Sequence, residues 1–408
     1  MSAGPLDGVR VIEVASWMFI PSGGAVLIDW GAEVLKIEHP ETGDPQRGLI
    51  TSGLIPGSNG KQPINFMIEQ PNRGKKSIAI DISKPEGHEA LMKLVETADV
   101  FLTNYLPPIR RKLKIDTDDI RARNPNIIIA RGSGQGPKGP DAEAGGFDGA
   151  SFWARGAVGT VMPPGEGGWP SGQIGPAFGD VMGGMATAGG IAAALVKRER
   201  TGEPSIVDVS LLSTAMWQIS PLIIMNKMFG IERIAGSGRG VPGNPGVGNY
   251  RTKDGRYIAM MLLQGDRFWG DWVTRLGRPD LVDDPRFVDA GARAANAADA
   301  QKELDSAFGE LTLDEFRKAM DGFDGVWAPF QTLAELYEDP QVIANGYLPT
   351  ADINGEPFQM VSSPAQFDES AFEVTRAPEH GEHTELELIE VGYDWDQLAA
   401  MKESGAIL

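Results

Sequence analysis

The chain has 408 residues, 41% hydrophobic and 23% charged, which is typical of a soluble globular protein with about two or three domains. A formal net charge of −19 argues against nucleic acid or an anionic membrane as the main partner. The absence of cysteine excludes disulfides, thiolate metal sites and cysteine nucleophiles. No N-terminal segment has the basic and then apolar layout of a signal peptide, so we expect a cytoplasmic protein.

Residues 1–40 have the pattern of a strand, a helix and a second strand. We expect the strands at 9–14 and 34–38, with Pro21 opening the helix between them. The connector 15–21 follows the C-terminal end of a strand, where open α/β sheets bind ligands. It lacks the G-x-G-x-x-G pattern, so a nicotinamide or flavin site is not indicated there.

Strands and helices continue to alternate further along the chain. The predicted strands are 77–82, 99–103 and 126–130, and the predicted helices are 90–98 and 116–124. This alternation favours an α/β fold with a parallel sheet that is covered on both faces. The glycine cluster at 132–136 is followed by two prolines, which predicts a turn and no phosphate-binding helix start.

A carboxylate stands before a long apolar segment. Asp180 precedes 181–196, which is rich in Gly, Ala and Met and predicts a buried helix with Asp180 as its N-cap. The segment is shorter than the roughly 18 apolar residues that a membrane span needs. An aspartate in this position is most often only a helix cap, so a catalytic interpretation depends on the rest of the chain.

The second half of the chain is less regular. It predicts one long apolar helix at 211–229, a hairpin at 250–263 that turns at Asp254-Gly255, and helices within 266–320. The glycine cluster at 236–248 is either a solvated linker or a mobile lid over a substrate. The pair His380 and His383 has no evident third ligand, so no metal site is predicted.

Short motifs form an ordered series along nearly the whole chain, and together they resemble the class III CoA-transferases. That superfamily also contains α-methylacyl-CoA racemase. Each motif is weak alone, but their order is specific. The motifs are 5–13, 31–38, 72–77, 98–100, 146–148, 179–180, 201–202, 207–210 and 381–384.

The resemblance implies a discontinuous, Rossmann-like CoA-binding domain from 1–210 and 335–408, a linker helix at 211–229 and a smaller α+β domain at 230–334. It also implies an interlocked homodimer. The implied reaction moves CoA from an acyl-CoA to an acceptor carboxylic acid, through aspartyl-anhydride and aspartyl-CoA intermediates on Asp180. Gly246 and Gly248 belong to the implied catalytic glycine loop. Acyl-CoA is a substrate, and no permanently bound cofactor is implied.

The resemblance also implies CoA contacts, residue by residue. Trp17, Met18 and Phe19 of the first connector are expected beside the pantetheine and the acyl group of CoA. Asn104 and Tyr105 form an Asn-aromatic pair that is expected near the nucleotide. The basic residues are expected near phosphates, unless they are ordinary solvated side chains. The residues are Trp17, Met18, Phe19, His39, Arg73, Lys75, Lys76, Asn104, Tyr105 and Lys112.

Two departures favour a transferase over an acyl-CoA racemase or epimerase of the same superfamily. Racemisation needs a second acid or base facing the aspartate. The racemase histidine is replaced here by Phe147, and a racemase glutamate by Gln264. The sequence leaves open a catalytically silent CoA-binding protein and a Rossmann oxidoreductase. The motifs at 147–148 and 152–156 are similar to those of members acting on aryl or branched hydroxy acids, and steroid-like or medium-chain acids stay open.

Overall fold

The computed structural model describes residues 4–49, 64–233 and 243–408. The chain forms two compact units, of which the first combines Met1–Met225 with Pro340–Leu408 and the second is Asn226–Asp339. The boundary at which the chain returns to the first unit, between Asp339 and Pro340, therefore lies a few residues beyond the expected domain boundary at 334/335. The first unit also includes part of the segment that was expected to be a linker.

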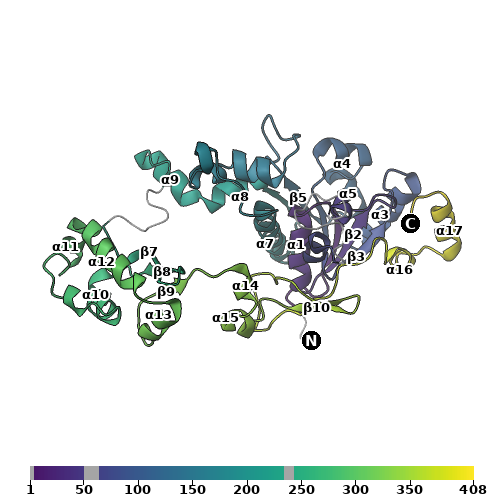
Figure 1. Ribbon diagram of the computed structural model, residues 1–408. Helices are drawn as coiled ribbons and strands as arrows, with labels where there is room; N and C mark the ends of the chain where they lie inside the picture. The colour runs from purple at the N-terminus through teal and green to yellow at the C-terminus, as the bar shows by residue number, and fades with distance from the viewer. Residues whose placement is uncertain (1–3, 50–63, 234–242) are drawn as a thin grey trace. The chain divides into compact units, whose positions relative to one another are not determined.

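A six-stranded parallel sheet forms the centre of the first unit (Figure 1), which confirms the predicted α/β class. The strand order β3-β2-β1-β4-β5-β6 is that of doubly wound nucleotide-binding folds. In such sheets the strand order reverses at one point, and ligands bind there, beyond the carboxyl ends of the strands. Here that point lies between β1 and β4. The strands are β1 (Arg10–Val14), β2 (Glu33–Glu38), β3 (Lys76–Ala79), β4 (Val100–Thr103), β5 (Ile128–Ser133) and β6 (Ile206–Ser210).

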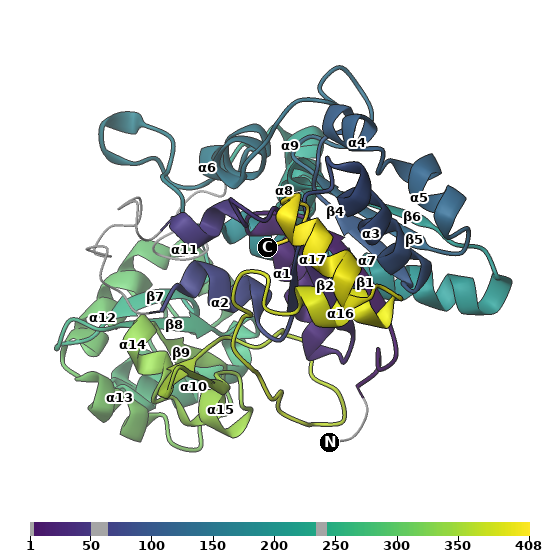
Figure 2. The ribbon, with the colours of Figure 1, turned by 90° about the vertical axis from the view of Figure 1, so that its right-hand side faces the viewer.

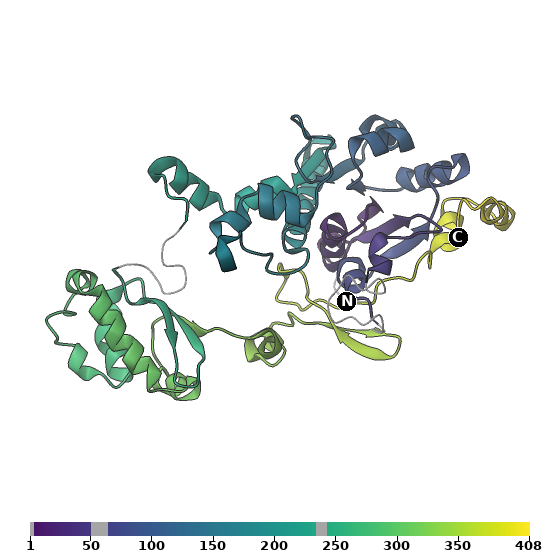
Figure 3. The same cartoon turned by 45° about the horizontal axis from the view of Figure 1, so that its top comes forward.

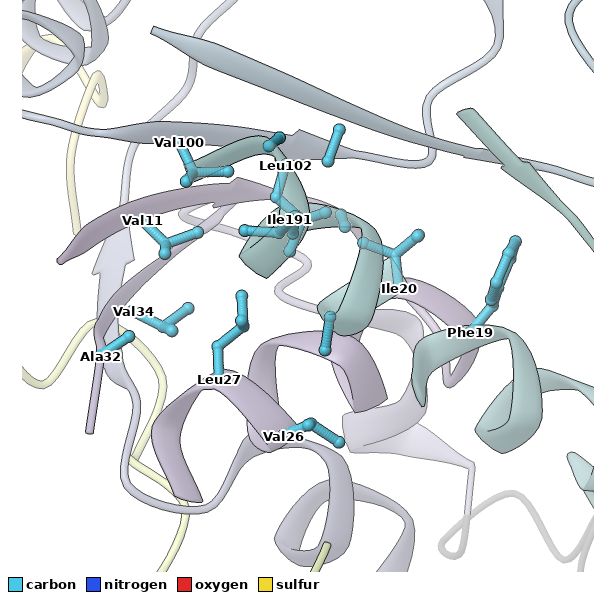
Figure 4. Packing of buried hydrophobic residues seen from close by; sticks show 14 of the residues in the cluster. Val11, Phe19, Ile20, Val26, Leu27, Ala32, Val34, Val100, Leu102 and Ile191 are labelled. Carbon is cyan, nitrogen blue, oxygen red and sulfur yellow. The ribbon is translucent and has the colours of Figure 1, made fainter. Parts of the chain in front are cut away.

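Helices cover both faces of this sheet because successive strand residues point to opposite sides. Val11 packs with α1 (Phe19–Asp29) and α7 (Phe178–Thr201), and Figure 4 shows Leu27 and Ile191 of these helices facing the strands. Its neighbour Ile12 belongs to the core on the other face. Figure 2 shows the C-terminal helices beside α3 on that second face. The helices of the second face are α3 (Pro85–Glu96), α5 (Thr117–Arg123), α16 (Thr384–Glu390) and α17 (Trp395–Glu403).

Helix α7 is the longest helix of the described part of the chain, and its small residues allow close packing against α1. A Cβ atom added at Gly183 would lie 2.4 Å from the ring of Phe19, and one at Gly184 would lie 2.0 Å from Ser22 Oγ. Among the described helices, α7 alone is long and apolar enough to cross a membrane. Because Ala188, Ile191 and Leu195 are buried against α1 and the sheet, it is a core helix of this fold.

Shorter elements complete the first unit. The helix expected over 211–229 is in fact two helices, since Pro221 has no N–H to continue the hydrogen-bonding ladder and instead occupies the first turn of α9. The shorter elements are α2 (Phe66–Asn72), α4 (Pro107–Leu113), the π-helical turn η2 (Asp148–Arg155), α6 (Val158–Val161), α8 (Leu211–Gln218), α15 (Pro340–Ala344), β10 (Thr350–Ile353) and β11 (Glu356–Gln359). Helix α9 (Ser220–Phe229) begins in the first unit, and its residues from Asn226 onward belong to the second.

The second unit has a three-stranded antiparallel sheet with helices packed on it (Figure 3). The predicted hairpin is confirmed, because β7 pairs with β8 around a turn that contains Gly255. The core of the second unit is rich in aromatic residues, and Tyr250 stacks on Phe308 with ring centroids 4.4 Å apart. The elements are β7 (Val247–Arg251), β8 (Tyr257–Met261), β9 (Trp327–Pro329), α10 (Gly265–Arg275), α11 (Ala290–Ala295), α12 (Ala297–Gly309), α13 (Leu313–Ala319) and α14 (Leu333–Leu336).

Candidate active site

A cavity of about 480 Å³ lies where β1, β4 and β5 end in the first unit. This is the edge at which a doubly wound sheet binds its ligand. The lining is largely aromatic and aliphatic, and Asp180 is its one carboxylate. The lining residues are Ser16, Trp17, Phe19, Pro45, Asn104, Tyr105, Leu106, Ile109, Gly132, Ser133, Gly134, Gly145, Gly146, Phe147, Asp180 and Leu211.

Asp180 lies inside the first turn of α7 and is not its N-cap, so the predicted capping role is wrong. The N-cap is Ala177, in a left-handed conformation (φ 59°, ψ 26°) and without a side-chain cap. The cap comes from elsewhere in the chain, because Asp148 Oδ1 accepts a hydrogen bond from the Gly179 N–H at 3.0 Å. The Asp180 side chain is therefore released from capping and lines the cavity.

The environment of Asp180 disfavours its ionised form. Burial raises its pKa to about 7, and the nearby carboxylate of Asp148 contributes to this rise. The positive end of a helix dipole favours a charged carboxylate and acts in the opposite direction. Desolvation and like charge prevail here. Burial also raises the pKa of Asp148, although the hydrogen bond from Gly179 partly offsets this.

The connector after β1 is held rigidly at the cavity. Ser16 N–H donates to Asn104 Oδ1 at 3.2 Å, and Asn104 Nδ2 donates back to the Ser16 carbonyl at 2.6 Å. Trp17 N–H donates to Asp44 Oδ1 at 3.3 Å. Trp17 adopts φ 69°, an unfavourable conformation for a bulky residue, and its ring meets Phe147 edge to face at 5.7 Å. Asn104 thus lines the cavity and also orients the connector.

The other two predicted connector residues, Met18 and Phe19, lie in different surroundings. Phe19 is buried and lines the cavity, and its contact with CoA stays a prediction. Met18 is buried too, but it lies outside the lining. It precedes α1 as the N-cap residue.

A network of buried ion pairs contacts this connector through Lys36 and Asp44. Lys75 Nζ lies 2.7 Å from Glu13 Oε2, and Lys36 Nζ lies 2.8 Å from Asp44 Oδ2. Lys36 also donates to the Ala15 carbonyl at 2.9 Å. Burial lowers the pKa of Lys75 to about 8 against the opposing effect of Glu13. Burial also disfavours charged Lys36, but Asp44 and Glu13 outweigh it and raise its pKa.

These contacts correct part of the predicted phosphate site. Arg73 is buried and bound by Asp29 at 2.9 and 2.7 Å, and Lys75 is buried in the network just described. Neither can reach a ligand phosphate without giving up its buried ion pair, so they do not fit the predicted role. Lys76 is half-buried and pairs with Glu33 and Glu387, so it also serves the fold.

His39 and Lys112 each line a further cavity of the first unit. Tyr105 lines both the 480 Å³ cavity and a second one of about 130 Å³, which also includes His39. Leu113 lines this second cavity and a third of about 340 Å³. The third contains Lys84, Lys112 and Lys114, with His88 beside them. Sequence reasoning missed Lys84 and His88, because no local pattern shows that they lie beside Lys112 and Lys114.

The two predicted catalytic glycines belong to the second unit. Gly246 N–H donates to Asn244 Oδ1 at 3.0 Å, and Gly248 lies in β7 opposite Met260. The expected loop is thus a strand from Val247 onward, because regular pairing with β8 begins there. Residues 236–242 of the glycine cluster lie outside the described residues. Closure of the loop over Asp180 stays a prediction.

The whole length of the chain is similar to known proteins. A model of CoA-transferase family III matches residues 6–384. The chain belongs to CoA-transferase family III. It is 34% identical to the (R)-2-hydroxy-4-methylpentanoate CoA-transferase of Clostridioides difficile, over 98% of this chain and 99% of that protein. It is 31% identical to the cinnamoyl-CoA:phenyllactate CoA-transferase of Clostridium sporogenes, over 98% and 97%.

Solved structures agree with this assignment to CoA-transferase family III. A CAIB/BAIF family protein from Brucella suis superposes with a TM-score of 0.80 at 28% identity, over 96% of this chain and all (100%) of that one. Rv3272 from Mycobacterium tuberculosis gives a TM-score of 0.79 at 28% identity, over 94% and 99%. The chain is therefore a CoA-transferase, an enzyme that moves CoA between carboxylic acids.

The cavity of this family III enzyme also bears on racemase activity. Phe147, which replaces the racemase histidine, lines the cavity, and its ring carries no proton to transfer. Apart from Asp180, Tyr105 is the one titratable residue among the residues that line it, and burial raises the pKa of Tyr105. Gln264 precedes α10 in the second unit. Among the described residues, no group of three or more His, Asp or Glu side chains is placed to hold a metal ion.

Proposed function

We propose that Asp180 is the nucleophile of this CoA-transferase and that CoA lies along the three cavities, of which the second shares Tyr105 with the first and Leu113 with the third. The observation that carries this proposal is the position of Asp180. It is a carboxylate with a raised pKa in an apolar cavity at the reversal of strand order. The lysine-lined third cavity suits the phosphates of CoA, in a chain whose net charge is −19.

The proposed reaction proceeds in four balanced steps. The Asp180 carboxylate attacks the thioester carbonyl of the donor, the C–S bond breaks, and CoA leaves as a thiolate from a mixed anhydride. The thiolate attacks the Asp180 carbonyl, which releases the donor acid and forms an aspartyl-CoA thioester. The acceptor carboxylate displaces CoA in the same way, giving a second anhydride. The thiolate then attacks the acceptor acyl carbon, and Asp180 is freed as a carboxylate.

The lining also indicates which acids are used. Trp17, Phe19, Phe147 and Ile109 offer bulky apolar surfaces beside Asp180. The two relatives named above act on 2-hydroxy-4-methylpentanoate and on cinnamoyl-CoA with phenyllactate. We infer that branched or aryl acids, including 2-hydroxy acids, are the substrates of this enzyme.

Incubating the enzyme with one acyl-CoA and a panel of acids, followed by mass spectrometry, tests the proposed function. Branched and aryl acids should gain CoA from the donor, and Asp180→Ala should abolish each exchange. CoA binding without exchange for any acid of the panel would favour a catalytically silent CoA-binding protein. Exchange of the substrate α-proton with solvent deuterium would favour a racemase.

The pH dependence of the first step follows from the raised pKa of Asp180. Attack requires the carboxylate, and burial holds its pKa at about 7, so the rate should rise with pH up to about 7 and level off above it. Single-turnover release of CoA thiol from acyl-CoA, measured between pH 5 and 9, checks this. A rate already constant from pH 5 upward would show that Asp180 titrates as an ordinary aspartate.

Substituting Lys112 in the third cavity should weaken acyl-CoA binding without slowing the chemical step. Lys112→Gln should raise KM for acyl-CoA by about 3- to 10-fold and leave kcat nearly unchanged, because an exposed lysine–phosphate contact contributes about 1 kcal/mol. Lys253→Gln, a lysine of the second unit, is the control for general loss of positive charge. Equal KM values for the two variants would remove Lys112 from the proposed CoA site.

A homodimer is proposed from the exposed apolar surface of α8 and α9. Trp217 is 79% exposed, and Met216 and Ile224 are exposed on the same helices within the first unit. Apolar surface of this kind is typically covered by another protein surface. Sedimentation velocity at micromolar concentration should show a dimer, and a stable monomer would contradict it. Interlocking of the two chains and a cytoplasmic location stay predictions.

A further inference from the structure

The first turn of α7 is fixed from outside the helix. Its N-cap residue, Ala177, offers no side-chain acceptor, although the first N–H groups of a helix have no intrahelical partner. Asp148 supplies the acceptor, with Oδ1 bound by Gly179 N–H at 3.0 Å and Oδ2 by Gln173 Nε2 at 3.2 Å. Asp148 is 6% exposed, so these bonds are shielded from water.

The backbone on either side of Asp180 is therefore held. Gly179 precedes it and is bound by Asp148, while Ser22 Oγ of α1 lies 3.4 Å from the Asp180 carbonyl. The approach of Asp148 requires a glycine at 179. A Cβ atom there would lie 2.4 Å from Asp148 Oδ1 and 2.2 Å from Phe152 Cγ.

Asp148 is itself placed by a packed element. It is the first residue of the π-helical turn η2, whose Ser151 and Phe152 are fully buried. Phe147, immediately before it, lines the cavity that contains Asp180. One short segment therefore contributes both an aromatic wall of the cavity and the acceptor that fixes the start of α7.

We infer that Asp148 is a positioning residue for CoA transfer, which holds the backbone at Gly179 so that Asp180 points at the bound thioester. This inference rests on the proposed function of Asp180. The reacting atoms in an enzyme must be aligned closely, and a displacement of about 1 Å can cost on the order of 100-fold in rate. Asp148 itself touches no reacting atom in this role.

The test compares Asp148→Ala, Asp148→Asn and Asp394→Ala. Asp148→Ala removes the acceptor and should lower kcat by about 10- to 100-fold, with KM for acyl-CoA within about 3-fold of wild type. Asp148→Asn keeps an acceptor oxygen and should restore kcat to within about 5-fold of wild type. Asp394 caps α17 through Gln397 N–H at 2.9 Å, so Asp394→Ala removes a similar cap remote from the cavity. It should lower the Tm without lowering kcat.

Two results would overturn the inference. One is a wild-type kcat in Asp148→Ala, and the other is a kcat in Asp148→Asn as low as in Asp148→Ala. If Asp148→Ala does not fold, Asp148→Asn still decides, because a loss of 10-fold or more in that folded, isosteric variant also contradicts the inference. An active Asp180→Ala variant would instead overturn the proposed nucleophile and the inference together. The inference alone fails where Asp180→Ala is inactive and Asp148→Ala is not impaired.

Discussion

Replacing Asp180 with asparagine should lower the rate of CoA transfer by about four orders of magnitude or more, the scale of loss when an enzyme nucleophile is removed. Asparagine keeps the shape of the side chain in the cavity but cannot form the anhydride. The kcat of Asp180→Asn and Asp180→Ala, measured with a branched acyl donor and an aryl acceptor acid, checks this. CoA should still bind with nearly wild-type affinity, because the lysines of the third cavity are untouched.

The same substitution should stabilise the protein at neutral and alkaline pH. The folded pKa of Asp180 is about 7, above its ordinary value of 3.8, so ionisation destabilises the fold increasingly as pH rises from about 4 to 7. The Tm gain of Asp180→Asn should therefore be larger at pH 8 than at pH 4. Asp118→Asn, an exposed aspartate in the first turn of α5, is the matched control and should keep full activity. An active, folded Asp180→Asn would contradict the proposed nucleophile.

Lys75→Met should destabilise the fold by about 3–5 kcal/mol, since it removes the cation closest to the buried Glu13 carboxylate. Glu13 and Lys75 are fully buried and in contact at 2.7 Å. The residual partner of Glu13 is Lys36, at 3.4 Å. Urea unfolding monitored by circular dichroism measures the change in free energy of unfolding.

The neighbouring Lys76 provides a matched control. Its side chain is 32% exposed and pairs with Glu33 and Glu387, so Lys76→Met should cost about 1 kcal/mol or less. The motif assigned the same role to both lysines, whereas the structure predicts a large difference between them. Equal, small losses for the two variants would show that the buried network contributes little to stability.

The fold was predictable to a large extent because hydrophobic alternation reports burial directly. The strands before Ala15 and at Asp99–Thr103 lie within a residue or two of the predicted places, since their buried runs are long. The break at Pro221 was missed because apolar residues continue across it on both sides. The hydrophobic pattern does not show the missing N–H of Pro221, and this single group decides where the helix divides.

The site was predictable at Asp180 and only in part around it. Motifs place residues in order along the chain, but they do not say which basic side chain is buried. Arg73 and Lys75 were therefore assigned to phosphates, although each pairs with a buried carboxylate. The capping role went to Asp180 instead of Asp148 because the contact joins residues that are distant in sequence. Such long-range contacts leave no local pattern.

Trapping the covalent intermediate tests the central claim most directly. The enzyme is incubated with acyl-CoA, treated with hydroxylamine, digested and analysed by tandem mass spectrometry. Attack of hydroxylamine on an aspartyl-CoA thioester should leave a hydroxamate on the peptide that contains Asp180, and only when acyl-CoA was present. Asp148→Asn should still form this hydroxamate, and Asp180→Asn should not. A hydroxamate on another residue, or none during active turnover, would contradict the assignment of Asp180 as the nucleophile.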